Sequence, residues 1–143
     1  MVTVEKIKKK ELNSLSKLYS QLVNEESIMS NMIKAFNSIE NNPNYYLMGV
    51  KLNQKLIGSA MAIICYDLVR ECRPFMVIEN VIIDKNYRGN GYGGTLINKI
   101  EDIAKKKNCH YIMLLSNKNR AKSHKFYSKH GYNCDNIGFK KYL

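Results

Sequence analysis

The 143-residue sequence lacks the features that mark membrane, secreted and metal-binding proteins. It has no apolar run of transmembrane length, and its first residues lack the apolar core of a signal peptide. The four cysteines lie far apart with no C-x-x-C pair, which argues against a zinc site or a disulfide framework. Neither a repeat nor a flexible linker is present. We therefore expect one cytoplasmic domain over residues 1–143, with reduced thiols and a single core.

Acidic residues are also scarce, since 12 Asp and Glu stand against 23 Lys and Arg and the net charge is +11. Such an excess is compatible with nucleic-acid binding. However, the basic residues are scattered along the chain, and no nucleic-acid-binding motif accompanies them. A basic nucleic-acid-binding domain is therefore the weakest of the alternatives, and a polyanionic small ligand would be attracted equally well.

The sequence does contain a strand, a glycine-rich turn and a helix between Phe75 and Lys107. Residues 75–83 are almost entirely apolar, which predicts a central strand covered on both faces. In the following helix, five apolar residues share one face: Leu96, Ile97, Ile100, Ile103 and Ala104. The turn between them, residues 88–94, reads Arg-Gly-Asn-Gly-Tyr-Gly-Gly. Glycine lets a ligand approach the backbone closely, and free N–H groups at a helix start suit a phosphate.

Three interpretations of this turn compete. The pattern satisfies G-x-G-x-x-G, but the acidic residue that a dinucleotide fingerprint needs about 20 positions later is absent from residues 113–117. No Gly-Lys-Ser/Thr follows, which excludes a P-loop. Residues 88–93 do match (Arg/Gln)-x-x-Gly-x-(Gly/Ala). In this they resemble the acyl-CoA pyrophosphate loop of the GCN5-related N-acetyltransferases (GNAT).

A second motif supports this resemblance. Residues 123–132, Ser-His-Lys-Phe-Tyr-Ser-Lys-His-Gly-Tyr, resemble the second signature of the same family, in the right order and spacing. The resemblance implies an α/β fold with a mixed sheet, antiparallel in its N-terminal strands and built around a central parallel β-α-β unit. It also implies transfer of an acetyl group from acetyl-CoA to a primary amine, by direct attack in a ternary complex.

The hydrophobic patterns predict a compatible order of elements. Strands are expected over residues 1–6, 45–51, 56–66, 75–83 and 110–115, with a tight turn at 52–55. Helices are expected over residues 11–24, 28–39 and 120–129 and after the glycine-rich turn. Residues 132–143 are long enough for two short strands that would close the sheet. This order predicts a mixed α/β sandwich.

The resemblance implies a general acid, and the central strand supplies a candidate base. Tyr127 matches the family tyrosine near the CoA sulfur, the alternative being an aromatic on the inner face of its helix. Glu79 is the candidate base, because a carboxylate in an apolar strand is costly unless it is partnered or functional, and burial would raise its pKa. A structural Glu79 bonded to backbone or to a lysine is the alternative. His124 and His130 are weaker candidates.

The resemblance also implies the residues that hold the cofactor. The backbone of Val81, Ile82 and Ile83 would pair with the pantetheine arm as an added strand does. The pyrophosphate would be held by N–H groups of Arg88, Gly89, Asn90, Gly91, Tyr92, Gly93 and Gly94, and Thr95 would cap the helix or contact phosphate. The chain departs from the family pattern at Arg120, where an Asn is usual, so that Asn119 would take over the pantetheine contact. Lys122, Lys125 and Lys129 are candidates for the adenosine 3′-phosphate.

The acceptor is left open by the sequence. Residues 24–44 and 67–74, which would bear specificity, carry no signature, so a small amine, an amino sugar, an antibiotic and a protein N-terminus all fit. Arg70 and Arg73 hint at an anionic group on the acceptor. A non-catalytic CoA-binding or regulatory module on the same fold is the second hypothesis, and a homodimer is compatible with either.

Overall fold

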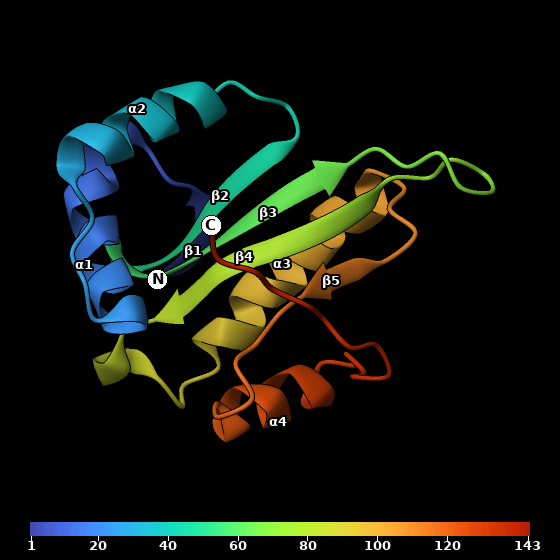
Figure 1. The fold of residues 1–143 in the computed structure, drawn as a ribbon. Helices are drawn as coiled ribbons and strands as arrows, with labels where there is room; N and C mark the ends of the chain where they lie inside the picture. Colours follow the sequence, from blue (N-terminus) through green and yellow to red (C-terminus); the bar gives the residue numbers. More distant parts are fainter. The chain divides into compact units, whose positions relative to one another are not determined.

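The computed structural model describes all 143 residues, which form two compact units, Met1–Met113 and Leu114–Leu143. Figure 1 shows the elements in chain order. The strands are β1 (Val2–Lys6), β2 (Tyr45–Leu52), β3 (Lys55–Cys65), β4 (Phe75–Ile83) and β5 (Ile112–Leu114). The helices are α1 (Leu12–Val23), α2 (Met29–Ile39), α3 (Tyr92–Lys106) and α4 (Ala121–Lys129), with short 3-10 turns η1 (Lys9–Glu11) and η2 (Lys85–Tyr87).

The sheet has the order β1-β2-β3-β4-β5. Its first four strands pair antiparallel, and β5 runs parallel to β4. The β2–β3 hairpin turns at Asn53 and Gln54, whose positive φ values of 48° and 67° are those of a type I′ turn. The predicted mixed sheet, antiparallel at its N-terminal strands and parallel around α3, is confirmed.

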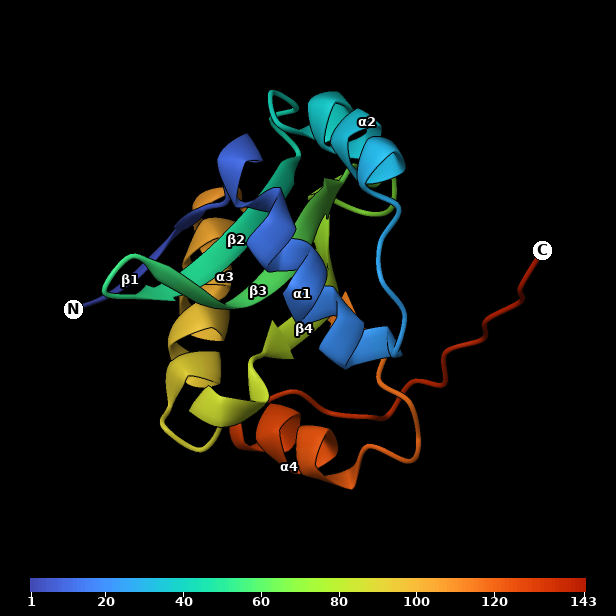
Figure 2. The same ribbon diagram turned by 90° about the vertical axis from the view of Figure 1, so that its left-hand side faces the viewer.

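Helices cover both faces of this sheet. In the first unit, α1 and α2 lie on one face and α3 on the other (Figure 2). On the α1 side a buried cluster joins Ile7, Leu12, Leu15, Leu18, Phe36, Leu56 and Ile82. The helix α3 buries Leu96, Ile97, Ile100 and Ala104. Each fully buried aliphatic side chain contributes roughly 1.5–3 kcal/mol by leaving water, so both faces help to hold the sheet.

The strand β4 lies between β3 and β5 and not at the centre of the sheet, and it is not covered on both faces. Met76 and Ile78 are buried, whereas Val77 is half-buried and Glu79 and Asn80 are exposed. The expectation of full cover was therefore wrong. Apolarity along a strand shows that burial is favourable, but the extent of the cover depends on how far the helix on each face reaches.

One charged side chain is buried beneath η1. Lys51 on β2 is 5% exposed, and its ammonium contacts Glu5 at 2.8 Å and Glu11 at 2.6 Å. Burial lowers the pKa of Lys51, but hydrogen bonds to Glu11 and Glu5 outweigh it, and the net shift is upward. The other oxygen of Glu11 accepts a hydrogen bond from the Lys8 N–H at 2.8 Å. Glu11 therefore ties the start of α1 to the sheet.

Replacement of Glu11 by glutamine is expected to destabilise the fold by about 1–3 kcal/mol, because a buried ammonium loses its better-buried partner. Chemical denaturation of Glu11→Gln beside Glu25→Gln measures this, since Glu25 is exposed and unpaired and its loss of charge serves as the control. Equal midpoints for the two variants would show that Glu5 alone satisfies Lys51.

The second unit contains one helix and a long tail. The helix α4 ends before Gly131, whose φ of +84° is the left-handed conformation that a glycine commonly adopts just after a helix. No strand follows, so the two strands predicted within residues 132–143 were wrong. The side chains of Ile137 and Phe139 are 81% and 91% exposed. A two-stranded hairpin is marginal by itself, and this tail does not bury enough apolar surface to fix one.

No helix of the structure combines the length and the apolar character needed to cross a membrane. All four cysteines are free thiols.

Candidate functional site

The glycine-rich turn forms an open loop between β4 and α3. Gly89 and Gly91 have φ values of +80° and +81°, which side chains rarely adopt. A Cβ atom added at either glycine would meet nothing within 4 Å. The loop therefore presents bare backbone to the space beside it.

The start of α3 supplies hydrogen-bond donors. None of the backbone N–H groups from Gly89 to Gly94 donates a hydrogen bond, and the first that does is that of Thr95, to the Gly91 carbonyl at 3.1 Å. Unpaired N–H groups together with the positive end of the helix dipole favour an anion. This arrangement fits the pyrophosphate that the sequence predicts for residues 88–94.

Side chains brace the loop from within. Arg88 Nε donates to the Ile83 carbonyl at 2.9 Å, and Asn90 Nδ2 donates to the carbonyls of Tyr87 and Arg88, both at 3.1 Å. The Thr95 hydroxyl donates to the Gly91 carbonyl at 3.2 Å from inside the helix, so Thr95 does not cap α3. The alternative role, contact with phosphate, stays a prediction.

The outer edge of β4 is open where pantetheine is predicted to bind. The Asp84 N–H donates to the Ile57 carbonyl of β3 at 2.8 Å, so by the alternation of a strand Val81 and Ile83 direct their backbone groups away from β3. The first bond between β4 and β5 runs from the Met76 N–H to the Tyr111 carbonyl at 3.0 Å. Since β5 has three residues and runs parallel, it lies beside the first half of β4 only.

A β-bulge separates the two halves of β4. Glu79 is opposite Met61 and Ile82 is opposite Ser59, so two residues of β4, Asn80 and Val81, face a single residue of β3. Asn80 has a φ of +55°, in the left-handed region that asparagine tolerates. Such bulges re-aim side chains and interrupt a ladder, often beside active sites.

Glu79 lies at this bulge on the α1 side of the sheet. It is exposed, and its carboxylate makes no hydrogen bond or ion pair. The argument that burial makes Glu79 costly was therefore wrong, because the bulge turns the side chain into the open part of this face. A carboxylate without a partner is nevertheless free to accept a proton.

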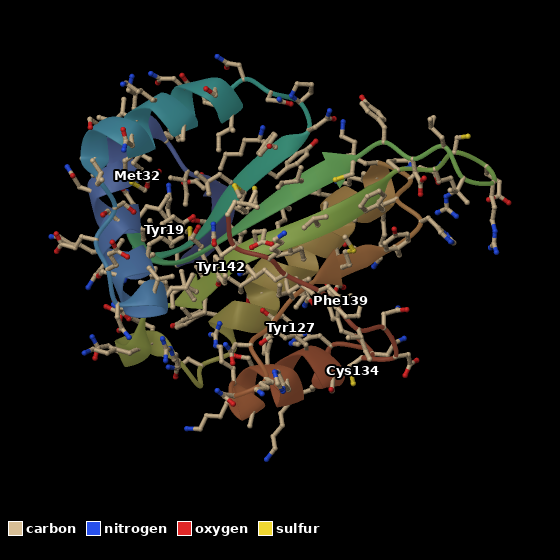
Figure 3. All side chains as sticks on the ribbon, in the orientation of Figure 1. Tyr19, Met32, Tyr127, Cys134, Phe139 and Tyr142 are labelled. Atoms are coloured by element: carbon tan, nitrogen blue, oxygen red, sulfur yellow. The ribbon has the colours of Figure 1, made fainter.

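Tyr19 on α1 faces the sheet, and the sequence did not mark it as a site residue. Its ring packs against the buried cluster, and Figure 3 shows it on the side of α1 that faces the sheet. Burial raises the pKa of Tyr19, while the side chains of Ser59 and Asn80 lower it less strongly. Helical periodicity placed Tyr19 in the core, and nothing in the sequence pattern marks the strand residues it meets.

The other predicted site residues lie in the second unit. Tyr127 on α4 meets the rings of Phe126 and Tyr132 edge-on, with centroids 5.2 and 5.9 Å away. Burial raises the pKa of Tyr127 and the charge of Arg120 lowers it in part, so the hydroxyl keeps its proton at neutral pH. The Asn119 side chain makes no hydrogen bond. The three candidate lysines of α4 are exposed.

Three minor candidates have structural partners. His124 Nε2 lies 2.8 Å from the Asn117 carbonyl before α4, and His130 packs on Phe126 with ring centroids 4.6 Å apart. Arg73 donates to the carbonyls of Asn108 and Cys109 at 3.2 and 3.0 Å, which ties the segment before β4 to the turn after α3. These contacts give each of the three side chains a structural role that requires no ligand.

Comparison with known proteins is consistent with this geometry. Residues 11–132 match the acetyltransferase (GNAT) family. A glucosamine 6-phosphate N-acetyltransferase of Trypanosoma brucei brucei is 36% identical over 78 residues, which are 54% of this chain and 51% of that protein. The chain thus spans about half the length of this curated relative, and 65% of a second one.

Solved structures share the whole fold. A protein of Agrobacterium tumefaciens str. C58 with a provisional acetyltransferase assignment has a TM-score of 0.92 at 26% identity, covering 99% of both chains. Glucosamine-6-phosphate N-acetyltransferase from Arabidopsis thaliana has a TM-score of 0.89 at 20% identity, covering 100% of this chain and 99% of that one.

Proposed function

Because the chain belongs to the acetyltransferase (GNAT) family, we propose that it transfers an acetyl group from acetyl-CoA to a primary amine. The observation that carries the proposal is the loop of Gly89–Gly94, whose six backbone N–H groups are unpaired at the start of α3. Acetyl-CoA supplies an activated thioester. Beside the loop, the open edge of β4 at Val81 offers a backbone N–H and carbonyl for the pantetheine arm.

Two side chains of this chain serve the transfer in the proposed mechanism. Glu79 accepts the proton that the attacking amine loses, directly or through one water. The C–N bond forms as the C–S bond breaks, and the Tyr127 hydroxyl donates its proton to the departing sulfur. Acid and base catalysis of this kind contribute roughly 10²–10⁴-fold each. No enzyme nucleophile is required, because the amine attacks the thioester itself in a ternary complex.

The acceptor is proposed to approach Glu79 over the α1 side of the sheet. Met61, which lies opposite Glu79, Ile63 and Val77 are half-buried on this face and offer apolar contact. Two of the similar proteins named above are glucosamine 6-phosphate N-acetyltransferases, so an amino sugar phosphate is the first acceptor to test. The net charge of +11 suits both this anionic acceptor and CoA.

Acetyl-CoA and CoA are expected to raise the unfolding temperature by several degrees. A ligand at about 100 times its dissociation constant stabilises the folded state by roughly 2.7 kcal/mol. Thermal unfolding with acetyl-CoA, CoA, NADH and a short DNA duplex in parallel tests this, followed by an amine screen with detection of free thiol. A shift only with NADH or DNA would contradict the proposal.

The non-catalytic alternative predicts a different pattern. A CoA-binding module would show the same shift with CoA but release no thiol with any amine. It would also be indifferent to Glu79→Gln and Tyr127→Phe.

A further inference from the structure

Every backbone N–H group of the short turn η2, which leads from β4 to the glycine-rich loop, has a hydrogen-bond partner. The Asn86 N–H donates to the Asp84 carboxylate at 2.9 Å, and the Tyr87 N–H donates to the Asp84 carbonyl at 2.8 Å. The Lys85 N–H has no partner within the turn and donates instead to Gln21 Oε1 of α1 at 3.0 Å. Gln21 therefore ties η2 to a helix that lies 64 residues earlier in the chain.

The turn η2 holds the glycine-rich loop in its own right. The Tyr87 carbonyl accepts a hydrogen bond from Asn90 Nδ2 at 3.1 Å. Asn90 stands between Gly89 and Gly91, the two residues of the loop with positive φ. Its side chain thus connects the middle of the loop to η2, so a contact that fixes η2 from outside also restricts the loop.

The helix α1 is a firm support for such a contact. Gln21 is half-buried, Leu18 one turn earlier is 3% exposed, and Leu22 packs against the buried cluster. A second contact reaches η2 from β3, where Lys55 Nζ donates to the Tyr87 hydroxyl at 3.1 Å. Lys55 is exposed, however, and holding its long side chain in place costs conformational entropy. Gln21 is therefore the stronger of the two anchors.

The loop needs an anchor because it has few contacts of its own. Residues 88–91 are exposed, and a Cβ atom added at Gly89 or Gly91 would meet nothing within 4 Å. A loop of this kind loses conformational freedom when it closes on a ligand, and that cost lowers affinity. Hydrogen bonds that restrict the loop beforehand reduce the cost.

We propose that Gln21 is a positioning residue for acetyl-CoA, whose side-chain oxygen holds the η2 turn and so keeps the glycine-rich loop in the conformation that receives the pyrophosphate. This proposal rests on the proposed function, since the loop is taken as the pyrophosphate site. Gln21 acts through Lys85 and touches neither acetyl-CoA nor the reacting atoms in this role. Its loss should weaken cofactor binding and leave kcat at saturating acetyl-CoA unchanged.

The test compares Gln21→Met with Ser20→Ala. Methionine suits a helix as well as glutamine does, but its sulfur is only a weak acceptor. The Ser20 hydroxyl donates within α1, to the Lys17 carbonyl at 2.8 Å, so Ser20→Ala removes a side-chain hydrogen bond that does not reach η2. By calorimetry we expect Gln21→Met to raise the dissociation constant of CoA about fivefold, the equivalent of one typical hydrogen bond, and Ser20→Ala to leave it unchanged. Equal constants for Gln21→Met and the wild type would overturn the proposal.

Amide exchange without ligand, followed residue by residue by NMR, tests the contact itself. Gln21→Met should speed exchange at Lys85, which loses its acceptor, and at Asn86 and Tyr87, while Ile100 in the buried face of α3 is unaffected. Gln21→Glu supplies a carboxylate oxygen at the same chain length and should restore slow exchange. Unchanged exchange at Lys85 in Gln21→Met would show that Gln21 does not hold the turn.

The two measurements together keep this proposal distinct from the proposed function. A wild type that binds neither CoA nor acetyl-CoA would contradict both proposals at once. A wild type that binds CoA, with faster exchange at η2 but an unchanged dissociation constant in Gln21→Met, would contradict the positioning role alone. In that case Gln21 would stabilise the turn without serving the cofactor.

Discussion

Replacement of Gly91 by alanine is expected to weaken acetyl-CoA binding at least about tenfold, a loss of roughly 1.4 kcal/mol. Gly91 is the residue before α3, with a φ of +81° and free space around the position of a Cβ. The added methyl group meets no protein atom, so it would project into the space that the pyrophosphate is proposed to occupy. Titration of acetyl-CoA by calorimetry measures the change in dissociation constant.

Gly131 provides a matched control for backbone strain. Its φ is +84°, and an added Cβ likewise meets nothing within 4 Å, but it follows α4 instead of preceding α3. Gly91→Ala and Gly131→Ala should each lose about 1 kcal/mol of stability, because alanine is strained in the left-handed region. Only Gly91→Ala should lose affinity. An equal loss of affinity in both variants would show that strain, and not the loop, governs binding.

Local patterns predicted most of the fold. The helical spacing of Leu12, Leu15 and Leu18 predicted α1, and the apolar pattern of residues 45–66 predicted the β2–β3 hairpin with its tight turn. Such elements bury one face against a neighbour, so their apolar residues recur along the sequence at the period of a helix or a strand. The glycine-rich turn was also predictable, because the backbone at Gly89 and Gly91 has a positive φ that few residues with side chains adopt.

Long-range properties were not predictable from these patterns. Residues 132–143 are long enough for two short strands, but a strand needs a partner ladder, and no local signal shows whether one is available. The exposure of Glu79 has the same origin. Its apolar neighbours predicted burial, whereas the bulge opposite Ala60 and the reach of α1 over the sheet decide the outcome.

Tyr19 shows why the surroundings of a side chain escape sequence reasoning. Tyr19 satisfies the helical period of α1 and is therefore indistinguishable from a core residue. Ser59 and Asn80, which affect the pKa of Tyr19, lie 40 and 61 residues further along the chain, and the antiparallel register of β3 and β4 brings them near one another. The neighbours of such a side chain are properties of the fold and not of any one segment.

Replacement of Glu79 by glutamine is expected to lower kcat about 10²–10⁴-fold, the usual contribution of a general base. The amide has the same shape but cannot take the proton of the attacking amine. Because Glu79 is exposed and makes no hydrogen bond or ion pair, the unfolding midpoint should not change. Loss of rate at constant stability would thus report chemistry and not folding.

Glu71→Gln is the control for the loss of one negative charge, since Glu71 is exposed in the loop between β3 and β4. It should leave kcat unchanged, while Glu79→Gln retains the wild-type shift of unfolding temperature with acetyl-CoA. Thiol release and thermal unfolding, measured on the same preparations, separate the outcomes. A Glu79→Gln variant with wild-type kcat would exclude Glu79 as the base. The amine would then have to lose its proton to water or to a group outside the bulge.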